Sequence, residues 1–183
     1  QADGLIALHR LATRDVPHRL QRKVRVVLQS ADAPEIGAEP DPNHFDVCVI
    51  GHLRDEKDPL RAALAARQLP RASALRVLQA GMAHTERWER AARQEEADNF
   101  RYQWLGELDR ESTRRLMAGC RAMVISSIME GGANVVSEAC RIGLPVLASD
   151  IPGNCGLLGE QYPGLFHVGD EAALADLLAR AEN

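Results

Sequence analysis

The sequence predicts an α/β protein built on a Rossmann-like, doubly wound parallel β-sheet. From residue 45 onward, short apolar runs alternate with segments in which apolar residues recur at helical spacing. The apolar runs are continuous and do not alternate with polar residues, as expected of parallel strands that helices cover on both faces. Hydrophobic residues make up 45% of the chain and aromatic residues only 4%, so the core of this sheet must be aliphatic.

The first half of the alternating region contains three predicted strands and two predicted helices. Short runs rich in apolar residues predict strands over 45–51, 75–81 and 101–106. Between them, the pattern predicts helices over 59–68 and 86–97.

The second half continues the alternation to the end of the chain. A helix is predicted to begin near Asn134, and Gly143 and Pro145 are the expected signals for its end. The remaining predicted elements are a helix over 111–119, a strand over 122–127, strands over 145–150 and 165–169, and a helix over 171–180.

Two further strands are predicted ahead of this region, over 4–8 and 24–28. Between them, residues 9–25 carry six Arg or Lys side chains and one Asp, with Pro17 in the middle. Because Pro17 would interrupt a helix, we do not expect a membrane-surface helix here, and a solvated helix or loop is the simpler interpretation. Residues 31–44 contain three prolines and four acids without Lys or Arg, which predicts a linker.

Length and charge argue against several classes of protein. The chain has 183 residues, with 22 Lys and Arg against 26 Asp and Glu, for a formal net charge of −4. Nucleic-acid binders usually present a basic surface, so no nucleic-acid partner is expected. No apolar run approaches the ~18 residues of a membrane-spanning helix, so no membrane span is expected. The chain starts at Gln1 without a signal-peptide pattern, and we expect it to be a piece of a longer protein.

The four cysteines predict neither a disulfide framework nor a zinc ribbon, because their spacing fits neither pattern. A reducing, cytoplasmic setting is therefore the default expectation. Cys48 and Cys140 lie in apolar surroundings and are expected to be small buried side chains. Cys155, within PGNCG, is expected in a loop that could face a site, although free thiols rarely have a chemical role without a base beside them.

Two loops are expected at the carboxyl edge of the sheet, where doubly wound folds bind their ligands. They are GHLRDEKDP (51–59) and SSIMEGGANVV (126–136). In the second loop, Gly131 and Gly132 permit close backbone approach, and the helix that begins near Asn134 directs free N–H groups toward the loop. Such a helix start can bind phosphate, although most Gly-Gly pairs are only turns.

Four charged side chains in or near these loops are candidates for ligand binding. Glu138 follows Glu130 by eight positions, so it can lie beneath an anion at the helix start and accept hydrogen bonds from vicinal hydroxyls, as in a ribose. Glu130 can reach whatever is attached beyond the phosphates, and Lys57 and Arg54 can supply positive charge from the neighbouring loop. The alternative is structural, with Glu130 as a first-turn acid and Glu138 as an exposed helix charge.

The segment SSIMEGGANVVSEACRIGLPVLASD resembles the donor-binding stretch of family-4 glycosyltransferases, which have the GT-B fold. That family has two glutamates separated by seven residues and a Gly-rich loop, followed by a small-residue helix, Gly-x-Pro-Val and a strand that ends in Ser/Thr-Asp. VIGHLRDEKDP is similar to the family's strand and loop, and WLGEL (104–108) is similar to the loop whose backbone meets the nucleotide base. The resemblance runs from about Phe45 to Leu178.

The resemblance implies a role for each matched residue. Lys57 would stabilise charge on the UDP leaving group, Glu130 would hold sugar hydroxyls, and Glu138 would hold the ribose. The family usually has Arg where this chain has His52, so Arg54 or His52 would supply the missing donor. His52 is also a candidate proton carrier, although a structural hydrogen bond is the commoner role of such a histidine. The other implied contacts are the backbone of Leu105 with the base, and the helix start with the diphosphate, through Gly131, Gly132, Ala133, Asn134 and Val135.

More narrowly, GHLRDEKDP together with MEGGANVVSEA, LPVLASDIPG and LLGEQYPG resembles the selenosugar synthases of selenoneine biosynthesis. Those enzymes join a sugar from a UDP-sugar to selenophosphate, which implies UDP-GlcNAc or a similar donor and selenophosphate as substrates, without a cofactor or metal. Three alternatives stay open: a family-4 glycosyltransferase with a hydroxyl acceptor, a sugar-nucleotide epimerase of the same fold, and a non-catalytic nucleotide-binding module.

The resemblance also implies a division of the chain into three parts. Residues 1–30 would be a remnant of the N-terminal acceptor domain, and residues 31–44 would be the linker. Residues 45–183 would be the nucleotide-sugar donor-binding domain, which is the C-terminal domain of a GT-B glycosyltransferase. A chain divided in this way is expected to bind the donor and, as a fragment, to be inactive.

Overall fold

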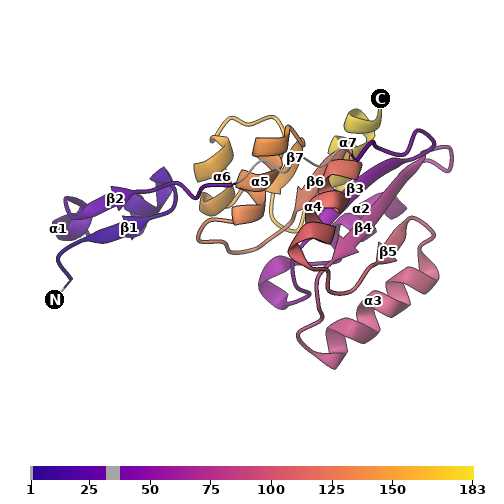
Figure 1. Cartoon of the computed structure of the whole chain (residues 1–183), viewed down its shortest axis with the longest axis horizontal. Coiled ribbons are helices and arrows are strands. Elements are labelled where there is room, and N and C mark those ends of the chain that lie inside the picture. Colours follow the sequence, from indigo (N-terminus) through magenta and orange to yellow (C-terminus); the bar gives the residue numbers. More distant parts are fainter. Residues whose placement is uncertain (1, 32–37) are drawn as a thin grey trace.

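The computed structural model describes residues 2–31 and 38–183, which form a six-stranded and a two-stranded β-sheet with helices around them (Figure 1). All pairings of the larger sheet are parallel, and its strand order is β5-β4-β3-β6-β7-β8. The prediction of a parallel sheet is therefore confirmed. Its strands are β3 (Phe45–Ile50), β4 (Leu75–Ala80), β5 (Tyr102–Trp104), β6 (Ala122–Ile125), β7 (Val146–Ser149) and β8 (Leu165–Phe166).

A helix follows each strand of this sheet, as the alternating pattern predicts for all of them except the helix over Pro152–Leu158. These helices are α2 (Arg61–Arg67), α3 (Glu86–Asp98), α4 (Arg110–Gly119), α5 (Asn134–Ile142), α6 (Pro152–Leu158) and α7 (Glu171–Glu182), with a short 3-10 turn, η2 (Asp55–Lys57), after β3. Asp109 caps α4 by accepting the Ser112 N–H at 2.7 Å, and Gly143 ends α5 in the left-handed region at φ 73°.

The core consists of two apolar clusters on the two faces of the sheet. Val47 and Val49 of β3 belong to one cluster, together with buried residues of α2 and α7. Cys48, between them, belongs to the other cluster, with buried residues of α4 and α5. Because successive side chains of a strand point to opposite faces, helices cover both faces, and the doubly wound arrangement is confirmed.

The N-terminal residues form a separate small unit that projects to one side of the large sheet (Figure 1). Strands β1 (Leu5–Ala7) and β2 (Val24–Val26) pair in parallel, and the basic stretch between them forms a 3-10 helix, η1 (Arg10–Asp15), and one turn of helix, α1 (His18–Gln21). Most side chains of this stretch are exposed or half-buried, which agrees with the predicted solvated helix or loop. The unit packs against α6, and Arg14 pairs at 2.9 Å with Glu160, which follows the end of this helix.

Within the predicted linker 31–44, residues 32–37 lie outside the described residues, and residues 38–44 contain no helix or strand. Asp41 ties this segment to the sheet, because its carboxylate lies 2.8 Å from His44 Nδ1 and 3.1 Å from the Arg76 guanidinium. Across residues 2–31 and 38–183, no helix has the length and apolar character to cross a bilayer.

Two predictions about cysteines are wrong. Cys140 is exposed, because α5 buries Val136 and Ala139 against the sheet and presents Cys140 on its outer surface. Cys155 lies in α6 and not in a loop, because Pro152 occupies the first turn of a helix, where its missing N–H has no cost. Cys48 is buried as predicted, and all four cysteines are free.

Candidate active site

The strand order places a crevice at the carboxyl edge of β3 and β6. From β3 the sheet extends one way through β4 and β5 and the other way through β6, β7 and β8, so the chain reverses its direction across the sheet between these neighbours. In open α/β sheets, ligands bind outside the carboxyl ends of the strands at such a reversal. The loops that meet there are the two that the sequence singles out, after β3 and after β6.

Lys57 and Glu130 meet in this crevice. Lys57 ends η2, Glu130 lies in the loop before α5, and Lys57 Nζ forms an ion pair with Glu130 Oε1. The two side chains are only 19% and 12% exposed, so the pair is largely shielded from water. Ser127 Oγ donates a hydrogen bond to the same carboxylate at 2.8 Å. The sequence places these two residues on neighbouring loops, and the ion pair between them is a finding of the structure.

Buried hydroxyl and amide groups tie the two loops together. Ser126 Oγ lies within hydrogen-bond distance of the carbonyl oxygens of Lys57, at 3.1 Å, and Asp58, at 2.8 Å. The Ile128 N–H donates to the carbonyl of Glu56 at 2.8 Å. The positions of Lys57 and Glu130 are therefore set by the backbone on both sides. Sequence reasoning missed the role of Ser126, for which two serines directly after an apolar strand are the available signal.

A second buried network supports the Glu130 loop from α6. Ser149 Oγ donates to the carbonyl of Ser127 at 2.6 Å, and Asn154 Nδ2 donates to the carbonyl and hydroxyl oxygens of Ser149 at 3.0 and 3.1 Å. Ser149 and Asn154 are fully buried. Gly153 lies against the loop so closely that a Cβ there would be 2.3 Å from the Glu130 carbonyl oxygen. The sequence gives no signal for Asn154, because its partners lie on other elements.

A cavity of about 330 Å³ opens beside the ion pair, at the ends of β3 and β4. It brings together three residues that the sequence predicts as site residues, namely His52, Arg54 and Lys57. His52 Nδ1 accepts a hydrogen bond from the Met82 N–H at 3.3 Å, and Arg54 Nε lies 3.9 Å from Glu56 Oε2. The opposite wall comes from the segment after β5 and from α4, through Glu107, Leu108 and Thr113.

Gly81 allows the floor of this cavity to form. Its φ is 148°, and a Cβ there would lie 2.0 Å from the carbonyl oxygen of Gly51. Gly81 N–H donates to the Gly106 carbonyl at 2.7 Å, and Trp104 Nε1 donates to the Gly81 carbonyl at 2.9 Å. The ends of β3, β4 and β5 are thereby joined through backbone groups, which only a residue without a side chain permits.

Leu105 lies just beyond β5, which ends at Trp104, two residues before the predicted end of this strand. The N–H of Leu105 donates to the Gln79 carbonyl at 2.8 Å and is therefore engaged within the sheet. A nucleotide base at this loop would meet the Leu105 carbonyl or the groups that follow it.

The start of α5 carries the remaining predicted residues. The side chain of Asn134 donates to Glu138 Oε1 at 3.1 Å, so the half-buried Glu138 lies one turn along the same face. Ala133 is buried, Val135 is half-buried and Gly131 is exposed. The close neighbour of Gly132 is Leu8 of the N-terminal unit, since a Cβ on Gly132 would lie 2.8 Å from Leu8 Cβ.

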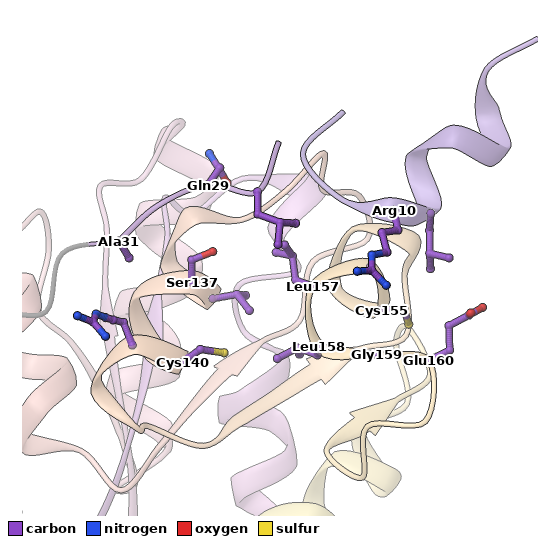
Figure 2. A pocket seen from close by; sticks show the side chains of 15 residues that line it. Arg10, Gln29, Ala31, Ser137, Cys140, Cys155, Leu157, Leu158, Gly159 and Glu160 are labelled. Carbon is purple, nitrogen blue, oxygen red and sulfur yellow. The ribbon is translucent and has the colours of Figure 1, made fainter. Parts of the chain in front are cut away.

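A larger cavity, of about 810 Å³, lies between the N-terminal unit and helices α5 and α6 (Figure 2). Arg10 reaches into it from η1, and Cys140 and Cys155 border it from α5 and α6 (Figure 2). None of the predicted site residues lines it. Burial raises the pKa of the Cys155 thiol, so this thiol stays protonated at neutral pH and is a poor nucleophile. The crevice at the carboxyl edge, and not this larger cavity, is therefore the candidate active site.

Within residues 2–31 and 38–183, no group of three or more His, Cys, Asp or Glu side chains is placed to hold a metal ion. The groups that the crevice offers are cationic side chains, imidazoles, hydroxyls and backbone N–H groups. Together with the carboxylates of Glu130 and Glu107, these groups can donate to an anion and accept from hydroxyl groups attached to it.

Comparison with known proteins finds a matching family and solved structures with a similar fold. The family described as "Glycosyl transferases group 1" matches residues 35–183. HepE of Anabaena, solved in complex with UDP-glucose, is similar at 20% identity and a TM-score of 0.79, over 98% of this chain and 54% of that one. A glycosyltransferase from Rickettsia africae is similar at 13% identity and a TM-score of 0.80, over 98% and 53%.

A third similar structure is a mutant of TarM from S. aureus in complex with fondaparinux, α-GlcNAc-glycerol and UDP. It is 18% identical, with a TM-score of 0.76, over 99% of this chain and 37% of that one. At these identities the likeness shows a shared fold. The chain spans about half the length, or less, of the solved structures that it matches.

Proposed function

Because this chain belongs to the group 1 glycosyl transferases and has the fold of the C-terminal half of their GT-B enzymes, we propose that it binds a UDP-sugar whose sugar is transferred to an acceptor. The observation that carries the proposal is the meeting of Lys57 and Glu130 at the carboxyl edge of β3 and β6, beside the cavity of about 330 Å³. UDP-glucose in HepE and UDP in TarM support UDP as the nucleotide.

Each part of the donor has a partner in the crevice. We place the base against the segment after Trp104, the ribose hydroxyls on Glu138, and the diphosphate at the α5 start, from Gly131 to Val135. The N–H groups at a helix start and the positive end of its dipole favour phosphate at this position. The half-buried carboxylate of Glu138 lies one turn further along the same face, where it can accept two hydrogen bonds from vicinal hydroxyls.

Lys57 would be the main group that stabilises the negative charge of the transition state. When the bond between the sugar and the diphosphate breaks, the electron pair stays on the UDP oxygen, and negative charge develops there. A fixed cation beside such an oxygen contributes about 3–4 kcal/mol to transition-state stabilisation. The hydrogen bonds of Ser126 with the backbone carbonyls of Lys57 and Asp58 hold Lys57 in place, so this side chain needs little reorganisation during the reaction.

Donor binding would open the Lys57–Glu130 ion pair. In the structure the two charges neutralise each other. With the donor bound, Lys57 would turn to the diphosphate and Glu130 to the sugar hydroxyls, with Ser127 still holding one carboxylate oxygen. The pair therefore keeps both groups at the site until the substrate replaces each partner.

We propose selenophosphate as the acceptor, on the strength of the loops that resemble selenosugar synthases. In this reaction the selenium atom would form a bond to the anomeric carbon as the bond from that carbon to the UDP oxygen breaks. Selenophosphate is already an anionic nucleophile, so no strong general base is required. The acceptor would be held mainly by a preceding domain, of which residues 1–30 form part and to which residues 31–44 are the linker. The free cysteines suit a reducing cytoplasmic setting.

Calorimetric titration with UDP tests the donor proposal. Lys57→Ala should weaken UDP binding about 10–100-fold, the usual value of a charged hydrogen bond. Lys23→Ala removes a half-buried lysine of the N-terminal unit, whose Nζ donates to the Ala2 carbonyl at 2.8 Å, and should leave binding unchanged. Glu138→Ala should weaken binding of UDP and of uridine, with the exposed Glu89→Ala on α3 as its control. Absence of UDP binding, or equal effects of the two lysine variants, would refute the proposal.

The acceptor is tested on the full-length protein with UDP-GlcNAc. Mass spectrometry should detect UDP and an equal amount of a sugar that carries the selenophosphate on its anomeric carbon when selenophosphate is present. Where water cleaves the P–Se bond of this product, the free selenosugar and an equal amount of phosphate should be detected instead. Transfer only to a hydroxyl acceptor would refute selenophosphate and leave the donor proposal intact. Turnover of UDP-GlcNAc without any acceptor would indicate an epimerase, and binding without turnover a nucleotide-binding module.

A further inference from the structure

Two imidazole rings lie side by side where the loops after β3 and β4 leave the sheet. The ring centroids of His52 and His84 are 5.1 Å apart, and the rings are tilted by 33°. His52 lines the cavity of about 330 Å³, whereas His84 stands outside the residues that line it. Both residues are exposed to solvent. His84 is therefore the outer neighbour of a residue that faces the proposed diphosphate site.

The backbone holds these two rings together. The Leu53 N–H donates to the Met82 carbonyl at 2.9 Å, and the His84 N–H donates to the Leu53 carbonyl at 3.1 Å. Leu53 and Ala83 form a parallel bridge that extends the pairing of β3 and β4 beyond their ends. Both histidines lie next to residues of this extended strand pairing. The backbone hydrogen bonds of the pairing therefore keep the two rings close to each other.

The hydrogen bond from Met82 selects the tautomer of His52. Its N–H points at Nδ1 of His52, 3.3 Å away, so Nδ1 is an acceptor and the proton of the neutral ring lies on Nε2. This leaves one N–H of His52 to donate to an anion in the cavity. A neutral imidazole contributes no charge, unlike the arginine that the family resemblance places at this position.

Without the imidazoles, the charged side chains around the crevice sum to a net negative charge. Lys57 is paired with Glu130, Arg54 lies 3.9 Å from Glu56, and Glu107 also lines the cavity, so two cations face three carboxylates. A diphosphate entering this site would meet a balance of charge that disfavours it. An imidazole can correct the balance by taking up a proton, because an adjacent anion favours its charged form.

The other charged groups near the pair are engaged elsewhere. Asp55, on the same loop as His52, accepts a hydrogen bond from Trp88 Nε1 at 3.0 Å and lies 3.8 Å from an Arg87 nitrogen. Its carboxylate is thus directed to α3.

We propose that His52 and His84 act as a pair that takes up one proton when the diphosphate of the donor binds. The inference rests on the proposed function. His52 contacts the anion through Nε2 and stays neutral, because its Nδ1 accepts the hydrogen bond from the Met82 N–H. The added proton therefore goes to His84, whose ring centroid lies 5.1 Å from that of His52. It comes from solvent and forms an N–H bond on the ring nitrogen of His84 that carries no proton in the neutral state. Two adjacent imidazoles do not both charge readily, so the uptake is one proton and not two.

Calorimetric titration of the chain with UDP, in two buffers of different ionisation enthalpy, measures this proton uptake directly. At pH 7.5 the terminal phosphate of UDP is largely deprotonated, since its second pKa is about 6, so uptake reports on the protein. The wild-type chain should take up a proton with UDP and none with uridine. His84→Gln should remove at least half of the uptake and weaken UDP binding about 3–10-fold, the loss expected for one weakened hydrogen bond to an anion.

His18→Gln is the matched control, because His18 is exposed on α1 of the N-terminal unit. It should match the wild-type chain in both affinity and proton uptake. If His84→Gln binds UDP with the same affinity and the same uptake as His18→Gln, the paired role is refuted while the proposed function stands. If the wild-type chain does not bind UDP at all, the proposed function fails and the inference fails with it.

Discussion

Glu130→Gln is expected to tighten the binding of UDP, although Glu130 belongs to the proposed active site. Lys57 is bound to the Glu130 carboxylate in the structure, and UDP must displace that partner before its diphosphate can bind the lysine. An amide at position 130 keeps the size of the side chain and can still accept the hydrogen bond from Ser127, but it no longer holds Lys57 by charge. The substitution therefore removes a competitor of the diphosphate.

The burial of the pair sets the size of the effect. Exposed ion pairs contribute about 0–1 kcal/mol, and breaking a fully buried pair costs about 3–5 kcal/mol. With side chains 19% and 12% exposed, this pair lies between these limits, and about 1–2 kcal/mol is a reasonable value after allowance for solvent screening. UDP should accordingly bind Glu130→Gln about 5–30-fold more tightly than it binds the wild-type chain.

The assay is calorimetric titration of UDP and of UDP-GlcNAc into both chains. The preference of the wild-type chain for UDP-GlcNAc over UDP should shrink in Glu130→Gln, because the carboxylate proposed to hold sugar hydroxyls is lost. Glu107→Gln removes a carboxylate from the same cavity without touching the pair, and should raise UDP affinity by about twofold or less. Equal or weaker binding of UDP by Glu130→Gln would refute the idea that the ion pair competes with the donor.

Three further predictions concern stability. Gly81→Ala should lower the free energy of unfolding in urea by at least ~2 kcal/mol, because its Cβ would lie 2.0 Å from a backbone carbonyl oxygen. Gly119 has open space around its Cα, so Gly119→Ala should not destabilise the chain. Equal urea midpoints for the two variants would contradict this account. Asn154→Ala removes two buried hydrogen bonds and should cost about 1–3 kcal/mol in the same assay, and Asn154→Asp should not restore it. Burial raises the pKa of Tyr102, so the free energy of unfolding should fall above pH ~10, where the unfolded chain loses this proton and the folded chain keeps it. Absorbance titration should show this phenol still protonated at pH ~11, and Tyr102→Phe should abolish its part of the pH dependence.

Most of the fold follows from local pattern. The continuous apolar runs around Val47 and Val146 predict buried parallel strands, and the structure has β3 and β7 there. The end of α5 at Gly143 also agrees with its sequence signal. These features are local, since a run of residues and its flanking turn residues determine them.

What the sequence does not predict depends on contacts between distant residues. A Pro and two glycines within 152–158 suggest a loop, yet α6 forms because Gly153 and Gly156 must fit closely against Glu130 and His9. Cys140 is exposed because of the way that α5 lies on the sheet, which its own apolar neighbours do not reveal.

The same distinction applies to the candidate site. The residue types and the two loops can be predicted, because Glu130, Glu138 and Lys57 stand in a recognisable order. The ion pair between Lys57 and Glu130 and the buried hydrogen bond from Ser149 to Ser127 cannot be predicted, because each joins two loops or strands that are separated by other elements of the chain.

The central claim is that the donor nucleotide lies in the crevice at the carboxyl edge of β3 and β6. A structure of this chain with UDP bound tests it most directly. The claim predicts the base beside Leu105, the ribose hydroxyls on Glu138 and the diphosphate between Lys57 and the start of α5. UDP in the cavity of about 810 Å³ beside Arg10 and α6, with the crevice unchanged, would contradict it.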